Sequence, residues 1–514
     1  MTARRPSLLL AAGLVALGAW HLVLRAPAVA LPLITDEGEY AVAARVWADG
    51  GLPYRDAFSQ KPPTTFLFYR AAAALSSSPR APRAAAAAAV LLTMLALFLC
   101  APRAWSVAGR LAGPAACAAL SLLPIGDYGF PANTETFVNL FTALAALALL
   151  RGAPFLSGLA AGAALTTKQT ALWTVLGFGA LASRGARRFD PRRLSLFLAG
   201  TACVPLYWLA YFAAWGGLRD YLDAAWLGNA RYAAVLARSG ALDEQLRWFS
   251  SALLPKLVLF SAPALALAGW SLRGRRAGKD RPVETLAVVW FSTSIAGSLT
   301  GLFLFPHYFV TAAPGLALGA ACGVERLTEG RRRAAAVLAL ALWPALLAPR
   351  LALFAGARER GLALLYPNPL FETKLLGEVI ARRAAPGDRL HVFGSEGALF
   401  VYSGLKPATR HTLSYALTLF PKDASSWREE MASLEAAPPR FVVWSGQPLS
   451  TMIFSKAGAD YRDAMRVFLS SGRYRYAGSV RVEFSAAAPE FGPAAPGEPP
   501  PFGARDRLIL FERR

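Results

Sequence analysis

Apolar and polar positions alternate in long blocks along the first 350 or so residues of this chain. Because a helix needs about 18 to 20 apolar residues to cross the hydrocarbon of a bilayer, the pattern predicts a polytopic α-helical membrane protein. We expect about eleven transmembrane helices, and a count of about ten or of twelve to thirteen stays open because the fifth and sixth apolar runs are short. The expected spans are 8–31, 84–100, 111–123, 136–150, 155–166, 170–182, 194–215, 249–270, 283–304, 309–324 and 334–354.

Composition agrees with this class, and the distribution of charge gives an orientation. Hydrophobic residues make up 55% of the chain and charged residues 17%, with a net charge of +22. A surplus of that size could indicate nucleic-acid binding, but the basic residues gather in short loops, at 184–193, 273–281 and 326–333. Such loops are typical of the cytoplasmic side of a membrane protein. We therefore expect no nucleic-acid partner and a cytoplasmic N-terminus, with the first apolar run kept as an uncleaved helix.

From about residue 358 onward the composition changes to that of a soluble domain. Strands are expected at 389–394, 441–444 and 508–511, with a helix at 427–436 between them and a Pro-, Gly- and Ala-rich loop at 486–503. The sequence thus predicts two parts, a transmembrane module at 1–357 and a small α/β domain at 358–514. An odd number of spans would place this domain outside the cytoplasm.

The first predicted external loop, residues 32–83, holds an unusually charged interval. Between residues 36 and 61 it carries five acidic and three basic side chains in a chain that is otherwise mostly apolar. Asp36 lies where the first helix should leave the membrane, so it is the best candidate for a carboxylate that orients or deprotonates a substrate. A solvated acidic loop is the alternative. For Glu37 the sequence favours a supporting role and simple solvation about equally, and we expect Glu39 to be solvated.

Lys61 at the end of this interval has a separate physical argument. The two prolines that follow, Pro62 and Pro63, restrict the backbone and suit the first turn of a helix. They should therefore fix the direction in which the lysine leaves the chain, and a fixed ammonium at a membrane surface suits a lipid phosphate. The alternative is an interfacial lysine at a helix end, whose side chain reaches toward the headgroups.

The pattern of Asp36-Glu37 followed by Tyr40, then 51–56 (GLPYRD) and Lys61-Pro62-Pro63, resembles the polytopic GT-C glycosyltransferases. It is most similar to bacterial relatives of the dolichyl-phosphate-mannose protein mannosyltransferases and of the lipid A aminoarabinose transferase. The resemblance covers nearly the whole chain, because 166–168 (TTK), 306–308 (PHY) and 387–394 also fit that family. The acidic pair and the Lys-Pro-Pro turn at this spacing are specific, whereas the later motifs alone would be weak.

This resemblance implies an enzyme that takes a sugar from a polyprenyl-phosphate carrier, expected to be undecaprenyl phosphate, and inverts its anomeric carbon. The acceptor would be a lipid, glycan or protein outside the cytoplasm, and the location a bacterial inner membrane. Candidate catalytic residues are Asp36 and Glu37. Candidate phosphate contacts are Lys61, Lys168, Arg55 and Arg45, and candidates for the substrate cavity are Tyr40, Tyr54, His307, Tyr308 and Glu135.

Simpler roles compete with several of these assignments. Lys168 could be a loop lysine at the bilayer surface, although a buried lysine there would need an anion as partner. Tyr308 with His307 suits an aromatic belt equally well, and either Arg45 or Arg55 could pair with the neighbouring acids.

Metal ions and cofactors are not expected, because no Cys/His metal spacing and no paired Asp-x-Asp motif stands in the external loops. Two other functions remain as alternatives. A transporter or flippase of lipid-linked saccharides would place ionisable residues at the membrane midplane, but the predicted spans are nearly free of charge. A catalytically silent scaffold is the second, and the joint presence of Asp36 and Lys61 argues against it.

Overall fold

The computed structural model describes residues 4–184, 189–272, 281–329, 356, 369–483 and 487–514. Contacts between Cα atoms divide the chain into two compact units. The first unit comprises Met1–Ala30, Pro82–Ala210 and Asp243–Ala355, and the second comprises Leu31–Ala81, Tyr211–Leu242 and Gly356–Arg514. The first loop and the segment after residue 210 therefore group with the C-terminal residues, which the sequence pattern did not predict. The predicted boundary at 357 stays a prediction, because it borders 357–368, outside the described residues.

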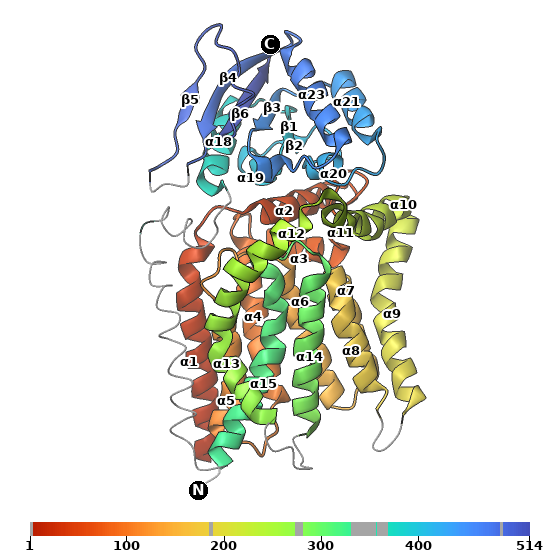
Figure 1. Ribbon diagram of the computed structural model, residues 1–514, viewed down its shortest axis with the longest axis vertical. Helices are drawn as coiled ribbons and strands as arrows, with labels where there is room; N and C mark the ends of the chain where they lie inside the picture. The colour runs from red at the N-terminus through yellow and green to blue at the C-terminus, as the bar shows by residue number, and fades with distance from the viewer. Residues whose placement is uncertain (1–3, 185–188, 273–280, 330–355, 357–368, 484–486) are drawn as a thin grey trace. The chain divides into compact units, whose positions relative to one another are not determined.

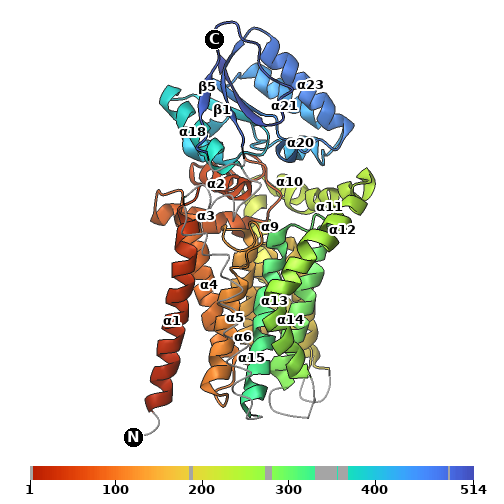
Figure 2. The same ribbon diagram turned by 60° about the vertical axis from the view of Figure 1, so that its left-hand side comes forward.

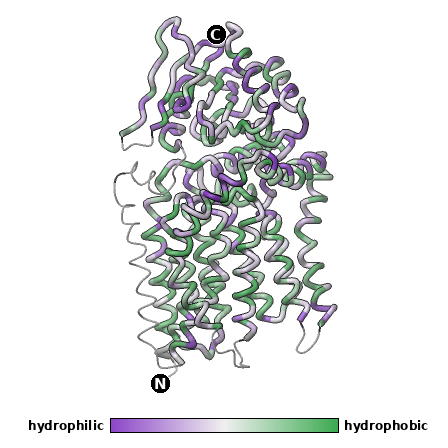
Figure 3. The backbone as a smooth tube through the Cα atoms, in the orientation of Figure 1, coloured by the Kyte–Doolittle hydropathy of each residue, from purple (hydrophilic) through white to green (hydrophobic). Residues whose placement is uncertain are grey.

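The first unit is a bundle of antiparallel helices (Figures 1 and 2). Apolar residues dominate these helices over most of their length (Figure 3), as a bilayer requires. The helices are α1 (Arg4–Val29), α4 (Ala81–Cys100), α5 (Val107–Leu120), α6 (Thr134–Leu150), α7 (Pro154–Leu165), α8 (Leu172–Ala182), α9 (Pro191–Ala214), α12 (Leu242–Trp248), α13 (Leu254–Leu272), α14 (Arg281–Thr300) and α15 (Ala313–Glu329), with short η1 (Gln169–Ala171), η3 (Phe249–Leu253) and η4 (Pro306–Ala312).

Six helical stretches among the described residues are long and apolar enough to cross a membrane, and four shorter apolar helices accompany them. The protein is therefore a polytopic helical membrane protein. Each predicted span from 8–31 to 309–324 falls on a helix of the first unit. The last one, 334–354, lies outside the described residues, so the count of eleven stays a prediction.

Within the bundle, the two ends differ in chemistry. The turns that carry Arg103, Arg151 and Arg184 lie at the end where α1 begins, which is the arrangement that a cytoplasmic face would have. The turns at 121–133 and 301–312 lie at the opposite end. All polar candidates of this unit lie at that second end.

The C-terminal part of the second unit is an α/β domain around a mixed six-stranded sheet of order β2-β1-β3-β6-β4-β5. Strands β2, β1 and β3 are parallel, while β6, β4 and β5 join them antiparallel. The strands are β1 (Arg389–Phe393), β2 (Lys406–Pro407), β3 (Phe441–Ser445), β4 (Tyr474–Arg481), β5 (Phe491–Pro493) and β6 (Arg507–Arg513), and the helices are α18 (Leu370–Arg383), α19 (Ala398–Ser403), α20 (Tyr415–Thr418), α21 (Ser426–Ala436), α22 (Pro448–Thr451) and α23 (Lys456–Ser470). The three predicted strands and the predicted helix coincide with β1, β3, β6 and α21.

The first loop contributes two helices to the same unit, α2 (Thr35–Ala48) and α3 (Pro63–Leu75), and the segment after residue 210 contributes α10 (Leu218–Tyr221), η2 (Leu222–Leu227) and α11 (Gly228–Ser239). Helix α2 packs directly on α19. A Cβ atom at Gly38 would lie 2.2 Å from the backbone nitrogen of Ala398, so only glycine fits there. Val42 belongs to the same buried cluster as Leu399 and the strands of the sheet.

Candidate functional site

The acidic pair opens helix α2. Glu37 is fully buried, and its carboxylate accepts a hydrogen bond from the backbone N–H of Ile34 at 3.0 Å, so it satisfies one of the free N–H groups at the helix start. Asp36 stands in the first turn and is half-buried, where the helix dipole favours negative charge. The structure thus gives Glu37 a capping contact and leaves Asp36 as the more accessible carboxylate of the pair.

Glu39 is buried, so the expectation that it would be solvated is wrong. Its side chain is 3% exposed, and Oε1 accepts a hydrogen bond from the hydroxyl of Tyr415 at 2.7 Å and another from the hydroxyl of Ser59. Burial raises the pKa of Glu39 to about 7, against the opposing attraction of Lys61. Sequence spacing could not reveal this arrangement, because Tyr415 comes from the C-terminal domain.

Lys61 is held from both sides of its backbone. Its N–H donates to Ser59 Oγ at 3.2 Å, and its carbonyl accepts from the hydroxyl of Tyr54 at 2.8 Å. The following prolines form the N-cap and first position of α3, as the sequence predicted. The ammonium group lies 5.9 Å from the ring centre of Tyr40, and the residue is 8% exposed. The backbone of the lysine is therefore held in place, and its ammonium group is buried near an aromatic ring.

Tyr54 explains how the turn before Lys61 is built. It adopts a left-handed backbone conformation with φ of 72°, which is strained for an aromatic residue. Its ring is fully buried and contacts Phe66, Phe212 and Tyr221 at centroid distances of 5.8, 5.2 and 5.3 Å. This packing and the bond to the Lys61 carbonyl stabilise the conformation, so Tyr54 supports Lys61 from behind. Its place in a substrate cavity stays a prediction.

The two candidate arginines of the first loop have protein partners. Arg45 donates to the carbonyls of Phe400 at 3.2 Å and Gly404 at 2.5 Å, which ties α2 to α19. Arg55 pairs with Asp56 at 2.8 Å on the surface, and this bond lowers the pKa of Asp56. The alternative in which Arg55 forms a salt bridge with a neighbouring acid thus agrees with the structure. The phosphate role of both arginines stays a prediction.

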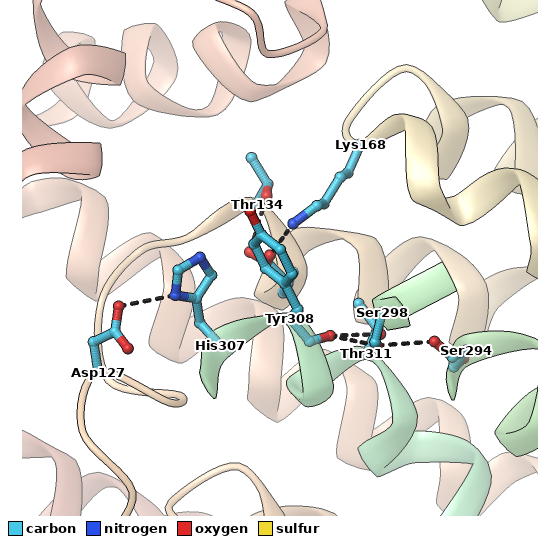
Figure 4. A network of polar contacts seen from close by, with 9 residues as sticks. Asp127, Thr134, Lys168, Ser294, Ser298, His307, Tyr308 and Thr311 are labelled. Atoms are coloured by element: carbon cyan, nitrogen blue, oxygen red, sulfur yellow. Dashed lines mark hydrogen bonds and ion pairs between the residues drawn. The ribbon is translucent and has the colours of Figure 1, made fainter. Parts of the chain in front are cut away.

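In the first unit, Lys168 is a buried lysine that pairs with a carboxylate. It follows α7, is 6% exposed, and forms an ion pair with Glu135 in the first turn of α6. The second oxygen of Glu135 accepts from the hydroxyl of Thr134 at 2.9 Å. The ammonium also lies 3.9 Å from the ring centre of Tyr308 (Figure 4). Lys168 is therefore buried and paired, and the alternative of a loop lysine at the bilayer surface does not describe it.

A second polar pair lies beside the first. His307 Nδ1 is 2.8 Å from a carboxylate oxygen of Asp127 (Figure 4), and its ring stacks on Phe305 with centroids 5.8 Å apart. The backbone here is anchored as well, since the carbonyl of Tyr308 accepts from the hydroxyl of Ser298 at 2.7 Å. The structure thus brings together Lys168, Glu135 and the adjacent His307 and Tyr308, which come from three separate segments of the sequence.

Across the described residues, no group of three or more His, Cys, Asp or Glu side chains is placed to hold a metal ion. The candidate side chains described above are carboxylates, ammonium groups and aromatic rings. These side chains suit a substrate that carries a phosphate and a sugar, because the cations complement the phosphate and the aromatic rings can pack on the sugar.

No protein-family model and no curated protein sequence matches this chain. Solved structures do. ArnT from Cupriavidus metallidurans bound to undecaprenyl phosphate matches with a TM-score of 0.57 and 15% identity, covering 97% of each chain. The apo state of the same protein gives 0.55 and 16%, again over 97% of each chain. An apo oligosaccharyltransferase from Archaeoglobus fulgidus gives 0.50 and 13%, covering 95% of this chain and 74% of the other. The chain therefore has the fold of the GT-C glycosyltransferases, as the first-loop motif led us to expect.

Proposed function

We propose that this protein is a glycosyltransferase that transfers a sugar from a polyprenyl-phosphate carrier to an acceptor outside the cytoplasm. The observation that carries the proposal is the fold match over 97% of both chains to ArnT, a structure that contains undecaprenyl phosphate. Lys61 supports it, because its backbone is held by two hydrogen bonds and its buried ammonium group would suit an anionic leaving group.

In the proposed reaction the acceptor oxygen forms a bond to the anomeric carbon on the face opposite the phosphate. The bond between this carbon and the phosphate oxygen breaks, so the configuration inverts. Asp36 takes the proton of an acceptor hydroxyl, and Lys61 stabilises the departing polyprenyl phosphate. If the acceptor is itself a phosphate, no strong base is needed, and Asp36 would position it instead.

Lys168 is proposed as a further contact to the donor phosphate, on its own argument. A buried lysine that already faces a carboxylate and an aromatic ring lies in a site built for negative charge. A phosphate could take the place of Glu135 as its partner. Tyr308 and His307, which contact each other at a centroid distance of 4.9 Å, are proposed to line the sugar site.

We also propose that the protein lies in a bacterial inner membrane with its N-terminus in the cytoplasm. This orientation rests on the arginine-bearing turns at the end of the bundle where α1 begins. It would place the turns at 121–133 and 301–312 on the outer side, where a lipid-linked donor that has been flipped would meet its acceptor.

The test is transfer of a radiolabelled sugar from polyprenyl-phosphate donors by the purified protein in lipid vesicles. We expect Asp36→Asn to lower kcat by about 100-fold or more, and Lys61→Ala to lower kcat/KM by a similar factor, about 100- to 1,000-fold. Asp49→Asn is the matched control, because Asp49 follows the same helix and pairs on the surface with Lys406 at 3.0 Å. Undiminished transfer by both Asp36→Asn and Lys61→Ala would reject the site, and a wild type inactive with every donor would reject the activity.

A further inference from the structure

The C-terminal domain holds helix α2 along its whole length. At the helix start, the backbone N–H of Leu33 donates to the hydroxyl of Tyr402 at 2.7 Å. In the middle, Gly38 lies against the backbone of Ala398. Toward the end, Arg45 donates to two carbonyls of the same domain. Most of these contacts involve backbone groups, so they fix the position of α2 without reaching the residues after it.

Hydrogen-bonded contacts also reach further, to the turn that carries Lys61, and one of them joins the backbone N–H of Phe58 to the carbonyl of Arg410 at 2.7 Å. Another runs through side chains. Tyr415 at the start of α20 donates to Glu39 Oε1 at 2.7 Å, and the same oxygen accepts from Ser59. Ser59 Oγ in turn accepts from the N–H of Lys61 at 3.2 Å. All three side chains are buried, with Tyr415 7%, Glu39 3% and Ser59 0% exposed. A continuous chain of hydrogen bonds therefore joins the C-terminal domain, helix α2 and the backbone of the lysine.

We propose that Glu39, Ser59 and Tyr415 are positioning residues, through which the C-terminal domain sets the place of Lys61 relative to Asp36. This inference rests on the proposed function, since it assigns a purpose to the geometry of that site. Glu39 is suited to the task because it lies one helical turn after Asp36, on the same face of α2. A shift of Tyr415 would therefore be transmitted to both candidate residues.

Protonation of Glu39 should change the strength of the hydrogen bonds that it accepts from Tyr415 and Ser59. Its pKa is raised to about 7 by burial, so the group changes charge near neutral pH. The groups that act on it are Lys61 from the turn, Asp36 from its own helix, and the hydroxyls of Ser59 and Tyr415, while Gly397 faces it with backbone alone. A carboxylate accepts hydrogen bonds more strongly than a neutral carboxyl group. The hydrogen bonds from Tyr415 and Ser59 to Glu39, which we call the bridge, are therefore strongest above pH 7. The rate of sugar transfer should rise as pH passes through that value.

The activity test compares Tyr415→Phe and Glu39→Gln with wild type. Tyr415→Phe should lower kcat/KM by about 10- to 100-fold, the scale of a small misplacement of catalytic groups. Tyr474→Phe is the matched control, because Tyr474 is 4% exposed and donates at 2.8 Å to a carbonyl of the same domain without touching the first loop. The double variant should lose little more than either single one, since both act through one bridge.

Glu39→Gln supplies a readout that a purely structural role would not change. Wild type should show a rise in kcat/KM centred near pH 7, whereas the variant should be flat there and remain at the level that wild type has at pH 6. If the step persists in Glu39→Gln, and Tyr415→Phe behaves like Tyr474→Phe, the proposal is overturned.

A second measurement does not depend on activity, so it separates this proposal from the proposed function. A carboxyl group whose pKa is raised from 4.5 to about 7 on folding stabilises the protein fully below its unfolded pKa, and this stabilisation is lost as pH rises through 7. The unfolding midpoint of wild type should therefore fall between pH 5 and 8, and Glu39→Gln should lack that part of the fall. If no donor supports transfer, this result still tests the ionisation of Glu39 on which the proposed pH dependence rests, and an unchanged pH dependence of unfolding in the variant would refute that part of the proposal.

Discussion

Two buried lysines, Lys168 in the first unit and Lys61 in the second, meet the cost of burial in different ways. Lys168 forms an ion pair with Glu135, while the carboxyl group near Lys61 is held by the hydroxyls of Ser59 and Tyr415. An anion that binds Lys168 must therefore compete with a carboxylate. At Lys61 it meets an ammonium that faces an aromatic ring. If both lysines contact the donor phosphate as proposed, Lys168 would exchange partners on binding, whereas Lys61 would keep its surroundings and add one contact.

The largest expected effect comes from breaking the pair in the first unit. Glu135→Ala would leave the ammonium of Lys168 buried without its carboxylate, and loss of one partner of a buried pair typically costs about 3 to 5 kcal/mol. Replacing both partners by apolar residues, as in Lys168→Met with Glu135→Leu, should restore most of the stability. Thermal unfolding in detergent measures both.

A measurement of transfer activity then distinguishes a structural role of the Lys168–Glu135 pair from a role of Lys168 in binding the donor. If Lys168 contacts the donor phosphate, the stable double variant should remain nearly inactive, with a raised KM for the donor. A double variant with wild-type kinetics would show that the pair only supports the bundle, and Lys61 would be left as the phosphate contact.

The next effect is expected at the turn of the second unit. Tyr54→Phe keeps the buried ring but leaves the carbonyl of Lys61 without its donor, which should cost about 2 kcal/mol of stability. Because the backbone of Lys61 would be less fixed, we also expect a raised KM for the donor. Denaturant unfolding and donor titration test this, with Tyr474→Phe as the control for loss of a buried hydroxyl. Equal KM values in the two variants would contradict the support role of Tyr54.

A smaller effect should follow from Arg45→Met. This change keeps the aliphatic length but removes the hydrogen bonds to the carbonyls of Phe400 and Gly404, at a cost of about 1 kcal/mol because the site is partly open to solvent. With only this structural role, KM for the donor should stay within about twofold. A clear rise in KM without loss of stability would instead support Arg45 as a phosphate contact.

The smallest effect is expected for Arg55→Ala. The Arg55–Asp56 pair is exposed, with side chains 46% and 36% accessible, and surface pairs contribute about 0.5 kcal/mol or less. Stability should change little, and less still at high salt. Donor titration at low and high ionic strength would reveal a phosphate role, if a strongly salt-dependent KM appears in wild type and disappears in the variant.

Much of the fold could be predicted from the sequence because its signal is local. The spans are continuous apolar runs, and strands β1, β3 and β6 are short apolar stretches bounded by polar residues. Strand β4 (Tyr474–Arg481) was missed, since it contains Arg475 and Gly478 and has no such run. The short strands β2 and β5 were missed too, and β5 (Phe491–Pro493) lies in the segment 486–503 that was expected to be a loop. The grouping of the first loop with the C-terminal domain was also missed, because it depends on the close approach of Gly38 to Ala398, which no periodicity announces.

The candidate site shows the same contrast between local signals, which the sequence reveals, and contacts between distant residues, which it does not. Asp36 and Lys61 could be singled out as candidates because a motif and two prolines mark them, and their roles stay proposals. The burial of Glu39 could not be seen, since the Tyr415 that binds it lies 376 positions further along the chain. The partner of Lys168 was anticipated only as an unnamed anion, and the structure supplies Glu135, which the sequence had placed in another loop.

The contact of Gly38 with Ala398 also decides how far this protein can be handled as separable modules. A chain cut near residue 357 would expose Val42 and would leave Gly38 and Arg45 without the backbone they lie against. The C-terminal domain of a relative could replace the present one only if its own backbone approached α2 as closely. The first loop and the C-terminal domain should therefore be exchanged together in any chimaera, and inherited together by any descendant that keeps this glycine.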